Sequence, residues 1–251
     1  MRISVIGGTG FMGSRLVRRL VAEGHEAIAH DRSTGCDLLT GEGLPQAVAS
    51  ADVVVNAIDA PSFDAAAASF FRTTADNLLA AAERARVRHA VLLSIVGIDR
   101  VPQVDYYRAK LLQEERFKHS AVAWSIVRST QFMEFVDKIM SWTTEGNTVR
   151  LPSTPLQPVA ADEAVQFLAE VSVGTPLKSI LNVAGPDVIP LDELGRLTLK
   201  ARPEGDLRVV TDESAGLFAA VSGGAVTAPK GARLGSVHYV RWLTERTPHP
   251  A

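Results

Sequence analysis

A glycine-rich segment near the start of the chain has the residue types and spacing of a phosphate-binding turn. The segment reads GGTGFMG and contains Gly7, Gly10 and Gly13. Gly7 allows a sharp turn, Gly10 lets a pyrophosphate approach the main chain because it has no Cβ, and Gly13 allows the next helix to pack closely. The free N–H groups at the positive end of that helix would hold the phosphates. We therefore predict a dinucleotide site, with a simple tight turn as the alternative. Its expected contacts are Gly7, Thr9, Gly10, Phe11, Met12 and Gly13.

An acidic residue after the second predicted strand, residues 26–30, extends this site. The carboxylate of Asp31 can accept hydrogen bonds from both hydroxyls of an adenosine ribose and would repel a 2′-phosphate. Arg32 and Ser33 could hold that phosphate if Asp31 turns aside. These residues favour NAD weakly over NADP and leave the choice open.

A second group of residues has the types needed for proton transfer. Tyr106 and Lys110 are four positions apart on one face of a predicted helix, residues 106–118. A phenol is a poor acid or base at neutral pH, and an ammonium group one turn away would lower its pKa. Ser94, at the end of a predicted strand, could hydrogen-bond the same substrate oxygen. We predict that Ser94, Tyr106 and Lys110 are catalytic and that Lys110 also contacts a cofactor ribose. The alternative is that Tyr106 is packing and Lys110 a solvated helix residue.

The elements that position these residues alternate between strands and helices. The first strand, residues 1–6, is followed by a helix over 14–22. Continuous apolar runs such as Val53–Val55 suit parallel strands that are covered on both faces. This order predicts an α/β fold with a Rossmann-type doubly wound parallel sheet. Further strands are expected at 52–57, 89–94 and 123–128, and further helices at 63–84 and 106–118.

The composition changes near residue 147, where prolines begin to separate short elements. We predict a dinucleotide-binding domain over 1–146 and a smaller α+β substrate-binding lobe over 147–251, with an approximate boundary and a shared core. Because ligands of open parallel sheets bind beyond the carboxyl ends of the strands, the lobe is expected to cover that edge. Its predicted elements are a helix at 162–171, a strand at 179–183 and a helix at 191–201.

Several segments resemble the atypical short-chain dehydrogenase/reductases, specifically the NmrA-like NAD(P)-binding group. They are GGTGFMG, LLSIVGIDRV and YYRAKLLQEE, with WSIVRSTQFMEF and NVAGPDVIPLDEL similar to later regions of that group. The resemblance covers most of residues 1–200. It implies a Rossmann fold, a small C-terminal substrate lobe, a nicotinamide dinucleotide in the glycine-rich turn, and a Ser, Tyr, Lys set at the catalytic position.

Two loops at the carboxyl edge of the predicted sheet are expected to line the site. Ala57 and Ile58 would follow the adenosine and phosphates of the cofactor. The resemblance implies that the loop with Ser129 and Thr130 lies beside the nicotinamide. The expected substrate contacts are Gln131, Phe132 and Phe135, with ordinary core packing as the alternative for the two phenylalanines.

The leading functional prediction is an NAD(P)-dependent oxidoreductase that transfers a hydride to or from a small or medium carbonyl substrate. Tyr106 would exchange the proton on the substrate oxygen. Two alternatives stay open, because members of the resembled group differ in activity. One is a redox-sensing NAD(P)-binding regulator without turnover, and the other is an epimerase or dehydratase that retains its cofactor. The interval between Ser94 and Tyr106 is shorter than in sugar-epimerase relatives, so the three side chains need not converge.

Composition argues against other classes of function. The chain has 251 residues and a formal net charge of −2, without the basic patch that nucleic-acid binding needs. No apolar stretch approaches the roughly 20 residues of a membrane helix. With the N-terminus interpreted as the first strand and not a cleavable signal, we expect a cytoplasmic protein. Cys36 is the only cysteine, and the histidines lack metal-binding spacing, so we expect no disulfide and no metal site. The expected partner is a small-molecule substrate, and helices beside the sheet could form a symmetric dimer with a second copy of the chain.

Overall fold

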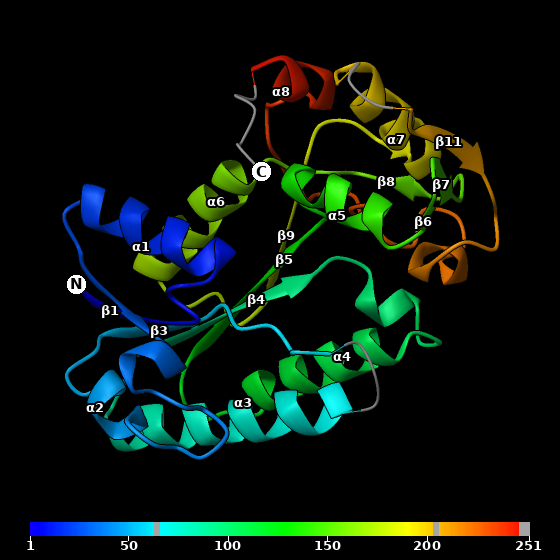
Figure 1. Ribbon diagram of the computed structural model, residues 1–251. Helices are drawn as coiled ribbons and strands as arrows, with labels where there is room; N and C mark the ends of the chain where they lie inside the picture. Colours follow the sequence, from blue (N-terminus) through cyan, green and yellow to red (C-terminus); the bar gives the residue numbers. More distant parts are fainter. Residues whose placement is uncertain (63–65, 203–205, 246–251) are drawn as a thin grey trace. The chain divides into compact units, whose positions relative to one another are not determined.

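The computed structural model describes residues 1–62, 66–202 and 206–245 (Figure 1). The start of the helix expected at 63–84 lies outside these residues. The chain divides by its contacts into two compact units. Unit 1 consists of Met1–Arg128 and Asp162–Leu181, and unit 2 of Ser129–Ala161 and Asn182–Ala251.

A seven-stranded sheet with the order β12-β9-β5-β4-β3-β1-β2 confirms the predicted Rossmann-type α/β fold. The strands from β2 to β4 pair in parallel, as do β9 and β12. Because β2 lies on one side of β1 and β3 on the other, the strand order reverses at the carboxyl end of β1. Ligands of such sheets bind at this reversal point. The strands are β1 (Arg2–Ile6), β2 (Glu26–His30), β3 (Val53–Asn56), β4 (His89–Ile95), β5 (Trp124–Ser129), β9 (Ile180–Ala184) and β12 (Arg233–Leu234).

Helices cover both faces of the sheet in unit 1. Figure 1 shows α1 and α6 on one face, and α3 and α4 on the other. All four residues of β3 are buried, as expected for a strand covered on both sides. Cys36 is buried in the same core. The helices are α1 (Phe11–Ala22), α2 (Leu44–Val48), α3 (Ala66–Arg84), α4 (Asp105–Lys118) and α6 (Ala161–Val173).

The glycine-rich turn leads directly into α1, which begins at Phe11 and not at the predicted residue 14. Met12, Leu16 and Leu20 are buried along one face of the helix. Their spacing of four residues forms the apolar stripe that packs against the sheet. The pattern therefore placed the helix correctly but missed its first turn.

The division into units differs from a single boundary at 146/147. The helix expected at 162–171, which is α6, belongs to unit 1. The segment after it hydrogen-bonds to β5, because Lys178 N donates to Trp124 O at 2.9 Å and Ile126 N donates to Ser179 O at 3.2 Å. Backbone pairing with β5 thus returns the chain to the first unit.

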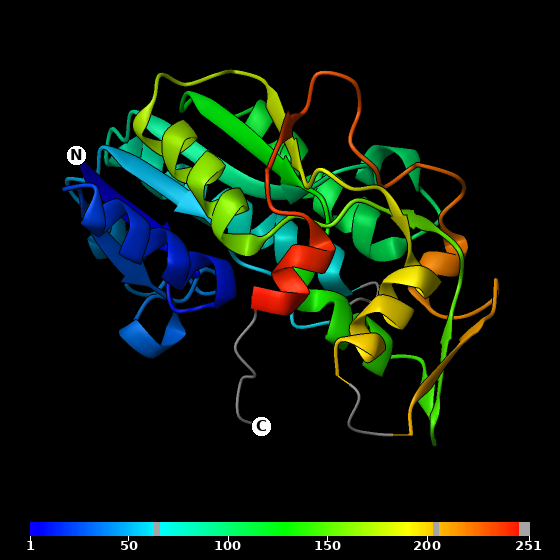
Figure 2. The ribbon, with the colours of Figure 1, turned by 90° about the horizontal axis from the view of Figure 1, so that it is seen from above.

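Unit 2 has the α+β composition that the sequence predicts for the smaller lobe. It holds a three-stranded sheet of order β11-β7-β6 and an antiparallel pair of β8 and β10. Figure 2 shows α7 beside β11, and a Cβ on Gly195 of this helix would lie 2.6 Å from Leu151 Cδ1 of β7. Glycine thus allows the close contact. The elements are α5 (Val136–Ser141), β6 (Thr144–Glu145), β7 (Thr148–Leu151), β8 (Pro155–Leu156), β10 (Ile189–Pro190), α7 (Leu191–Lys200), β11 (Arg208–Thr211) and α8 (Tyr239–Glu245).

In the described part of the chain, short 3-10 helices connect these elements: η1 (Arg32–Thr34), η2 (Ile98–Arg100), η3 (Met133–Phe135) and η4 (Leu217–Ala220). Within the described residues, every helix is too short or too polar to cross a membrane.

Candidate functional site

The glycine-rich turn has the backbone geometry that its residue types predict. Gly7 has a φ of 76°, in the left-handed region that favours glycine. A Cβ on Gly13 would lie 2.0 Å from Gly7 O, so only glycine lets α1 press against the turn. A Cβ on Gly10 would meet Gly7 O at 3.2 Å, which is a much milder contact. The structure thus places a severe steric limit at Gly13 and a milder one at Gly10.

Gly8 is a further essential glycine, to which the sequence analysis gave no role. A Cβ there would lie 2.5 Å from Ala29 Cα and 2.6 Å from Val5 O. Gly8 therefore lets the turn approach β2 closely. The signal was a second glycine directly after a buried strand.

The first turn of α1 can receive a phosphate. The first backbone N–H groups of an α-helix have no partner within the helix, and Gly10 provides no side-chain cap. The Arg15 guanidinium, which the sequence analysis missed, lies 4.0 Å from the centre of the Phe11 ring and adds positive charge beside this turn. The absence of a side chain at Gly10 and the positive helix end fit the pyrophosphate of a dinucleotide.

Asp31 lies directly after β2 and is held by the short helix that follows it. Its Oδ1 accepts hydrogen bonds from Ser33 N at 2.7 Å, Ser33 Oγ at 2.6 Å and Thr34 N at 3.2 Å. Asp31 is half-buried, whereas Arg32 and Ser33 are exposed. The recorded bonds fall on one carboxylate oxygen, so the cap fixes Asp31 at the strand tip.

The loop after β3 connects the glycine-rich turn to the predicted catalytic tyrosine. A Cβ on Gly7 would lie 3.0 Å from Ala57 C and 3.1 Å from Ile58 N, so this backbone packs against the turn. The next residue, Asp59, accepts a hydrogen bond from the Tyr106 hydroxyl through Oδ1 at 2.5 Å. The turn, the loop and the start of α4 therefore form one continuous path within unit 1.

The environment of Tyr106 contradicts the predicted lowering of its pKa by Lys110. The side chain is 5% exposed. Burial, followed by the charge and hydrogen bond of Asp59, raises the pKa of Tyr106 above the ordinary phenol value. Desolvation disfavours the phenolate, and a carboxylate that accepts the phenol proton also favours the neutral form. Burial alone raises the pKa of the neighbouring Tyr107 to about 12.

Lys110 is buried and bonded to other groups. Its Nζ donates to Gln113 Oε1 at 2.8 Å and to Leu93 O at 3.3 Å, and lies 4.7 Å from the centre of the Phe71 ring. Burial lowers the pKa of Lys110, while the charges of Asp59 and Glu114 act in the opposite direction. This excludes the alternative that Lys110 is a solvated helix residue.

Ser94 belongs to a buried ion-pair network. Its Oγ donates to Glu114 Oε1 at 2.6 Å. Glu114 also accepts two hydrogen bonds from Arg128, at 2.8 and 2.7 Å, and Arg128 donates to Asp99 at 3.0 Å. The recorded bonds therefore give Ser94, Tyr106 and Lys110 three different partners and do not join them to one another. The roles of Asp59, Glu114 and Arg128 were not predicted from the sequence. Only Glu114, four residues after Lys110 on α4, had a local spacing signal.

The remaining predicted residues lie in unit 2. Ser129 and Thr130 are buried, and their hydroxyls donate to Thr130 O at 2.9 Å and to Gln157 O at 2.6 Å. Both amide atoms of the Gln131 side chain are buried without a recorded partner in the described part of the chain. The rings of Phe132 and Phe135 pack edge to face at 5.6 Å, and Phe135 is 36% exposed. Phe135 is therefore only partly a core residue.

Residues 7–161 match the model of a protein family described as NAD(P)H-binding. The chain belongs to the NAD(P)H-binding family. This match covers more than half of the chain and includes the glycine-rich turn, Asp31, Asp59 and the first residues of unit 2. Membership of the NAD(P)H-binding family confirms the predicted resemblance to atypical, NmrA-like short-chain dehydrogenase/reductases.

Individual relatives of this NAD(P)H-binding protein are distant. Photosystem II assembly factor Ycf39 from Synechocystis sp. is 24% identical over 172 residues, which cover 59% of this chain and 53% of Ycf39. The matched region thus spans about half the length of this curated relative.

Solved structures share the fold of the NAD(P)H-binding protein at low sequence identity. UDP-N-acetylglucosamine 4-epimerase from Bacillus cereus has a TM-score of 0.72 and 15% identity, covering 100% of this chain and 99% of that one. Triphenylmethane reductase from Citrobacter sp. has a TM-score of 0.68 and 16% identity, over 84% and 79% of the two chains. A short-chain dehydrogenase/reductase superfamily protein from Agrobacterium tumefaciens with bound NAD has a TM-score of 0.67 and 16% identity, over 84% and 85%. These matches support the fold.

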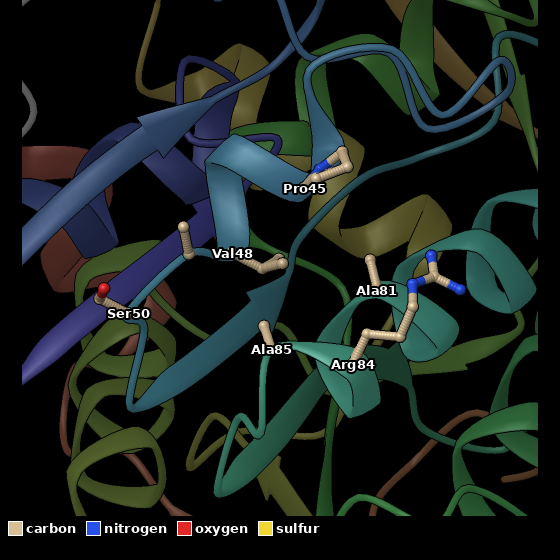
Figure 3. Close-up of a pocket in the computed structure, with 7 residues that line it drawn as sticks. Pro45, Val48, Ser50, Ala81, Arg84 and Ala85 are labelled. Atoms are coloured by element: carbon tan, nitrogen blue, oxygen red, sulfur yellow. The ribbon is translucent and has the colours of Figure 1, made fainter.

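A surface pocket elsewhere in unit 1 is separate from this site (Figure 3). It lies between α2, the turn before β3 and the end of α3, at the amino end of β3, whereas the glycine-rich turn follows the carboxyl end of β1. Its lining residues are Pro45, Val48, Ala49, Ser50, Ala81, Arg84 and Ala85. In the part of the chain that the structure describes, no three His, Cys, Asp or Glu side chains are grouped to hold a metal ion.

Proposed function

We propose that this protein is an NAD(P)-dependent oxidoreductase that interconverts a small or medium carbonyl compound and its alcohol. The observation that carries the proposal is the continuous path from the glycine-rich turn, through Ala57 and Ile58, to Asp59 and the Tyr106 hydroxyl. When bound, the nicotinamide dinucleotide supplies the hydride-transfer chemistry. Tyr106 exchanges the proton with the substrate oxygen.

The main chain from Gly7 to Gly13 and the first turn of α1 hold the pyrophosphate in this proposal. Asp31, fixed by its cap at the tip of β2, receives the adenosine ribose and supports a weak preference for NAD. The exposed guanidinium of Arg32 keeps NADP as the alternative.

Lys110 and Ser94 have narrower roles than the sequence predicts. An ammonium group has three donors, and two of those on Lys110 are used by Gln113 and Leu93, which leaves one for a cofactor ribose hydroxyl. The Ser94 hydrogen is given to Glu114, so Ser94 can only accept a hydrogen bond from a substrate hydroxyl. Gln131, Phe132 and Phe135 are the proposed substrate contacts in unit 2.

Calorimetry with NAD(H) and NADP(H), followed by nicotinamide absorbance with aldehydes, ketones, quinones and enones, tests the proposal. Tyr106→Phe is expected to keep cofactor affinity and to lose about 10²–10⁴-fold in turnover. Tyr107→Phe is the matched control, because it removes a neighbouring buried hydroxyl that has no recorded bond to Asp59. Unchanged turnover in Tyr106→Phe would remove this residue from the mechanism. Failure to bind either coenzyme would overturn the whole proposal.

A second candidate is a redox-sensing NAD(P)-binding regulator that does not turn over its cofactor. The engagement of Ser94, Tyr106 and Lys110 by three separate protein groups favours it. The distant relative Ycf39 is also named as an assembly factor. Cofactor binding without oxidation or reduction against the full panel of carbonyl compounds and alcohols would support this candidate.

A further inference from the structure

We propose that Tyr106 and Asp59 form a proton relay, in which Asp59 receives the Tyr106 proton when an alcohol is oxidised and returns it when a carbonyl is reduced. The inference rests on the proposed oxidoreductase function and names the residue that completes its proton path. Asp59 is a positioning residue, because it acts on the substrate through Tyr106.

The first argument for the relay is the direction of the hydrogen bond between Tyr106 and Asp59. A phenol has one hydrogen, and Tyr106 gives it to Asp59 Oδ1 at 2.5 Å. The phenol oxygen can then only accept a further hydrogen bond, which is what a substrate hydroxyl offers. In this state Tyr106 is arranged to take a proton from an alcohol while passing its own proton to Asp59.

The second argument for the relay is the difference in solvent exposure between Tyr106 and Asp59. Tyr106 is 5% exposed, whereas Asp59 is an exposed residue. The backbone N–H of Ala60 donates to the same Oδ1 at 2.8 Å and holds the carboxylate in place. A proton that enters at the buried phenol can therefore leave to water from the carboxylate.

The relay balances in atoms and charge. In oxidation, the substrate O–H bond breaks and its proton joins Tyr106 Oη, while the Tyr106 proton moves to Asp59 Oδ1. A bound nicotinamide would supply the hydride acceptor for the substrate carbon, and the neutral carboxyl of Asp59 then releases its proton to water. In reduction each step runs in reverse. The phenol is neutral before and after the transfer.

The groups around Tyr106 favour a proton transfer in which no free phenolate forms. Among the described residues, the titratable groups that raise the pKa of the phenol include Asp59 from the loop after β3 and Tyr107 from α4, and the Phe71 ring of α3 packs against the Tyr106 ring. The nearby ammonium of Lys110 is bonded to Gln113 and Leu93 O. Because burial raises the pKa of Tyr106, a concerted transfer to a carboxylate replaces the free phenolate as the base.

The first test is a tyrosine titration that needs no turnover. Ultraviolet absorbance of tyrosinate is recorded against pH for the wild type and for Asp59→Asn. The curve of Tyr106→Phe is subtracted from the first and the curve of the Asp59→Asn, Tyr106→Phe double variant from the second, so that the difference reports Tyr106. The Asp59→Asn change is expected to lower the Tyr106 midpoint by about one pH unit or more, because it removes the adjacent negative charge. Asp105→Asn is the control, since this exposed aspartate next to Tyr106 in sequence bonds to Arg108. An unchanged Tyr106 midpoint in Asp59→Asn would overturn the relay.

The second test is the pH profile of alcohol oxidation. Wild-type kcat is expected to fall on the acid side, because the relay needs a carboxylate at residue 59 that can accept the Tyr106 proton. In Asp59→Asn this acid limb should disappear, and the residual rate should stay low across the pH range, because the amide cannot accept the Tyr106 proton and burial still disfavours the phenolate. Asp105→Asn should keep the wild-type profile. An unchanged profile in Asp59→Asn would overturn the relay even if its titration shifts.

The two tests separate the relay from the function on which it rests. In one outcome, Asp59→Asn shifts the Tyr106 midpoint, but the wild type binds NAD(P) and turns over no substrate. This outcome would overturn both the oxidoreductase function and the relay, and the contact between Tyr106 and Asp59 would then be a structural hydrogen bond. Normal turnover with an unaffected midpoint and profile would overturn the relay alone.

Discussion

Gly10 and Gly13 of the glycine-rich turn differ in how severe a steric clash a larger residue would cause. A Cβ on Gly13 would lie 2.0 Å from a backbone oxygen, which cannot move without displacing α1 from the turn. A Cβ on Gly10 would lie 3.2 Å from the same oxygen, so a small shift accommodates it. Gly13 is therefore needed for the fold, whereas the proposed role of Gly10 is to leave space for the cofactor.

The pair Gly10→Ala and Gly13→Ala tests this distinction. Gly13→Ala is expected to destabilise the protein by about 1–3 kcal/mol, as overpacked sites do. Gly10→Ala should change the free energy of unfolding by less than about 1 kcal/mol but should weaken NAD(P) binding at least about tenfold. Urea unfolding and calorimetry measure the two effects. Equal cofactor affinity in Gly10→Ala and wild type would show that the pyrophosphate lies elsewhere.

The site residues that the sequence predicts belong to local patterns, whereas those that it does not predict depend on partners far away along the chain. The turn glycines and the Tyr106–Lys110 spacing are local patterns that a single sequence displays. Asp59 lies 47 residues before Tyr106, and nothing in the sequence shows that the two side chains meet. The predicted pKa of Tyr106 was wrong for the same reason, because the lysine is a local neighbour and the carboxylate is not.

At the scale of elements, the Glu114–Arg128 ion pair joins α4 to β5 and, through Ser94, to β4. Glu114 is fully buried and Arg128 is 6% exposed. Removing one charge of such a pair leaves the other buried without full compensation. The pair therefore maintains the position of α4, and with it the position of Tyr106.

Glu114→Gln tests the contribution of this pair. The variant is expected to lose about 3–5 kcal/mol of unfolding free energy, because Arg128 loses its bidentate partner. The matched control is Asp76→Asn, which breaks an exposed bidentate pair with Arg116 between α3 and α4 and should change stability little. The midpoint of urea unfolding measures both. Equal effects of the two substitutions would show that the buried pair has no special structural importance.

The elements of unit 1 were more predictable from sequence than those of unit 2. Long apolar runs and helical periodicity located β3, β4 and α4 to within a few residues, because these elements are buried along much of their length. The strands β6 and β8 have two residues each, and β7 pairs with β11, which lies far along the chain. Such short strands have no periodicity to detect, so their pairing depends on tertiary contacts.

At the scale of the whole molecule, His89 joins three segments of unit 1. It begins β4, and its Nε2 lies 2.8 Å from Ser125 Oγ of β5. The same hydroxyl accepts a hydrogen bond from Leu177 N at 2.8 Å, in the segment that leads into β9. Burial lowers the pKa of His89 from 6.5 to about 4. The fold therefore requires the neutral imidazole.

This requirement predicts a loss of global stability in mild acid. The pKa is lower in the folded chain than in the unfolded chain, so the unfolded state binds the proton first. The stabilisation is complete above the unfolded pKa of 6.5 and is lost as the pH falls towards the folded value of about 4. The shift corresponds to about 3 kcal/mol. Between pH 7 and pH 4, the decrease in the free energy of unfolding should be smaller in His89→Gln than in the wild type by that amount. His119→Gln, which changes an exposed histidine, is the control and should behave like the wild type. Chemical unfolding across this pH range measures the difference, and parallel curves for wild type and His89→Gln would show that His89 is not the group that titrates.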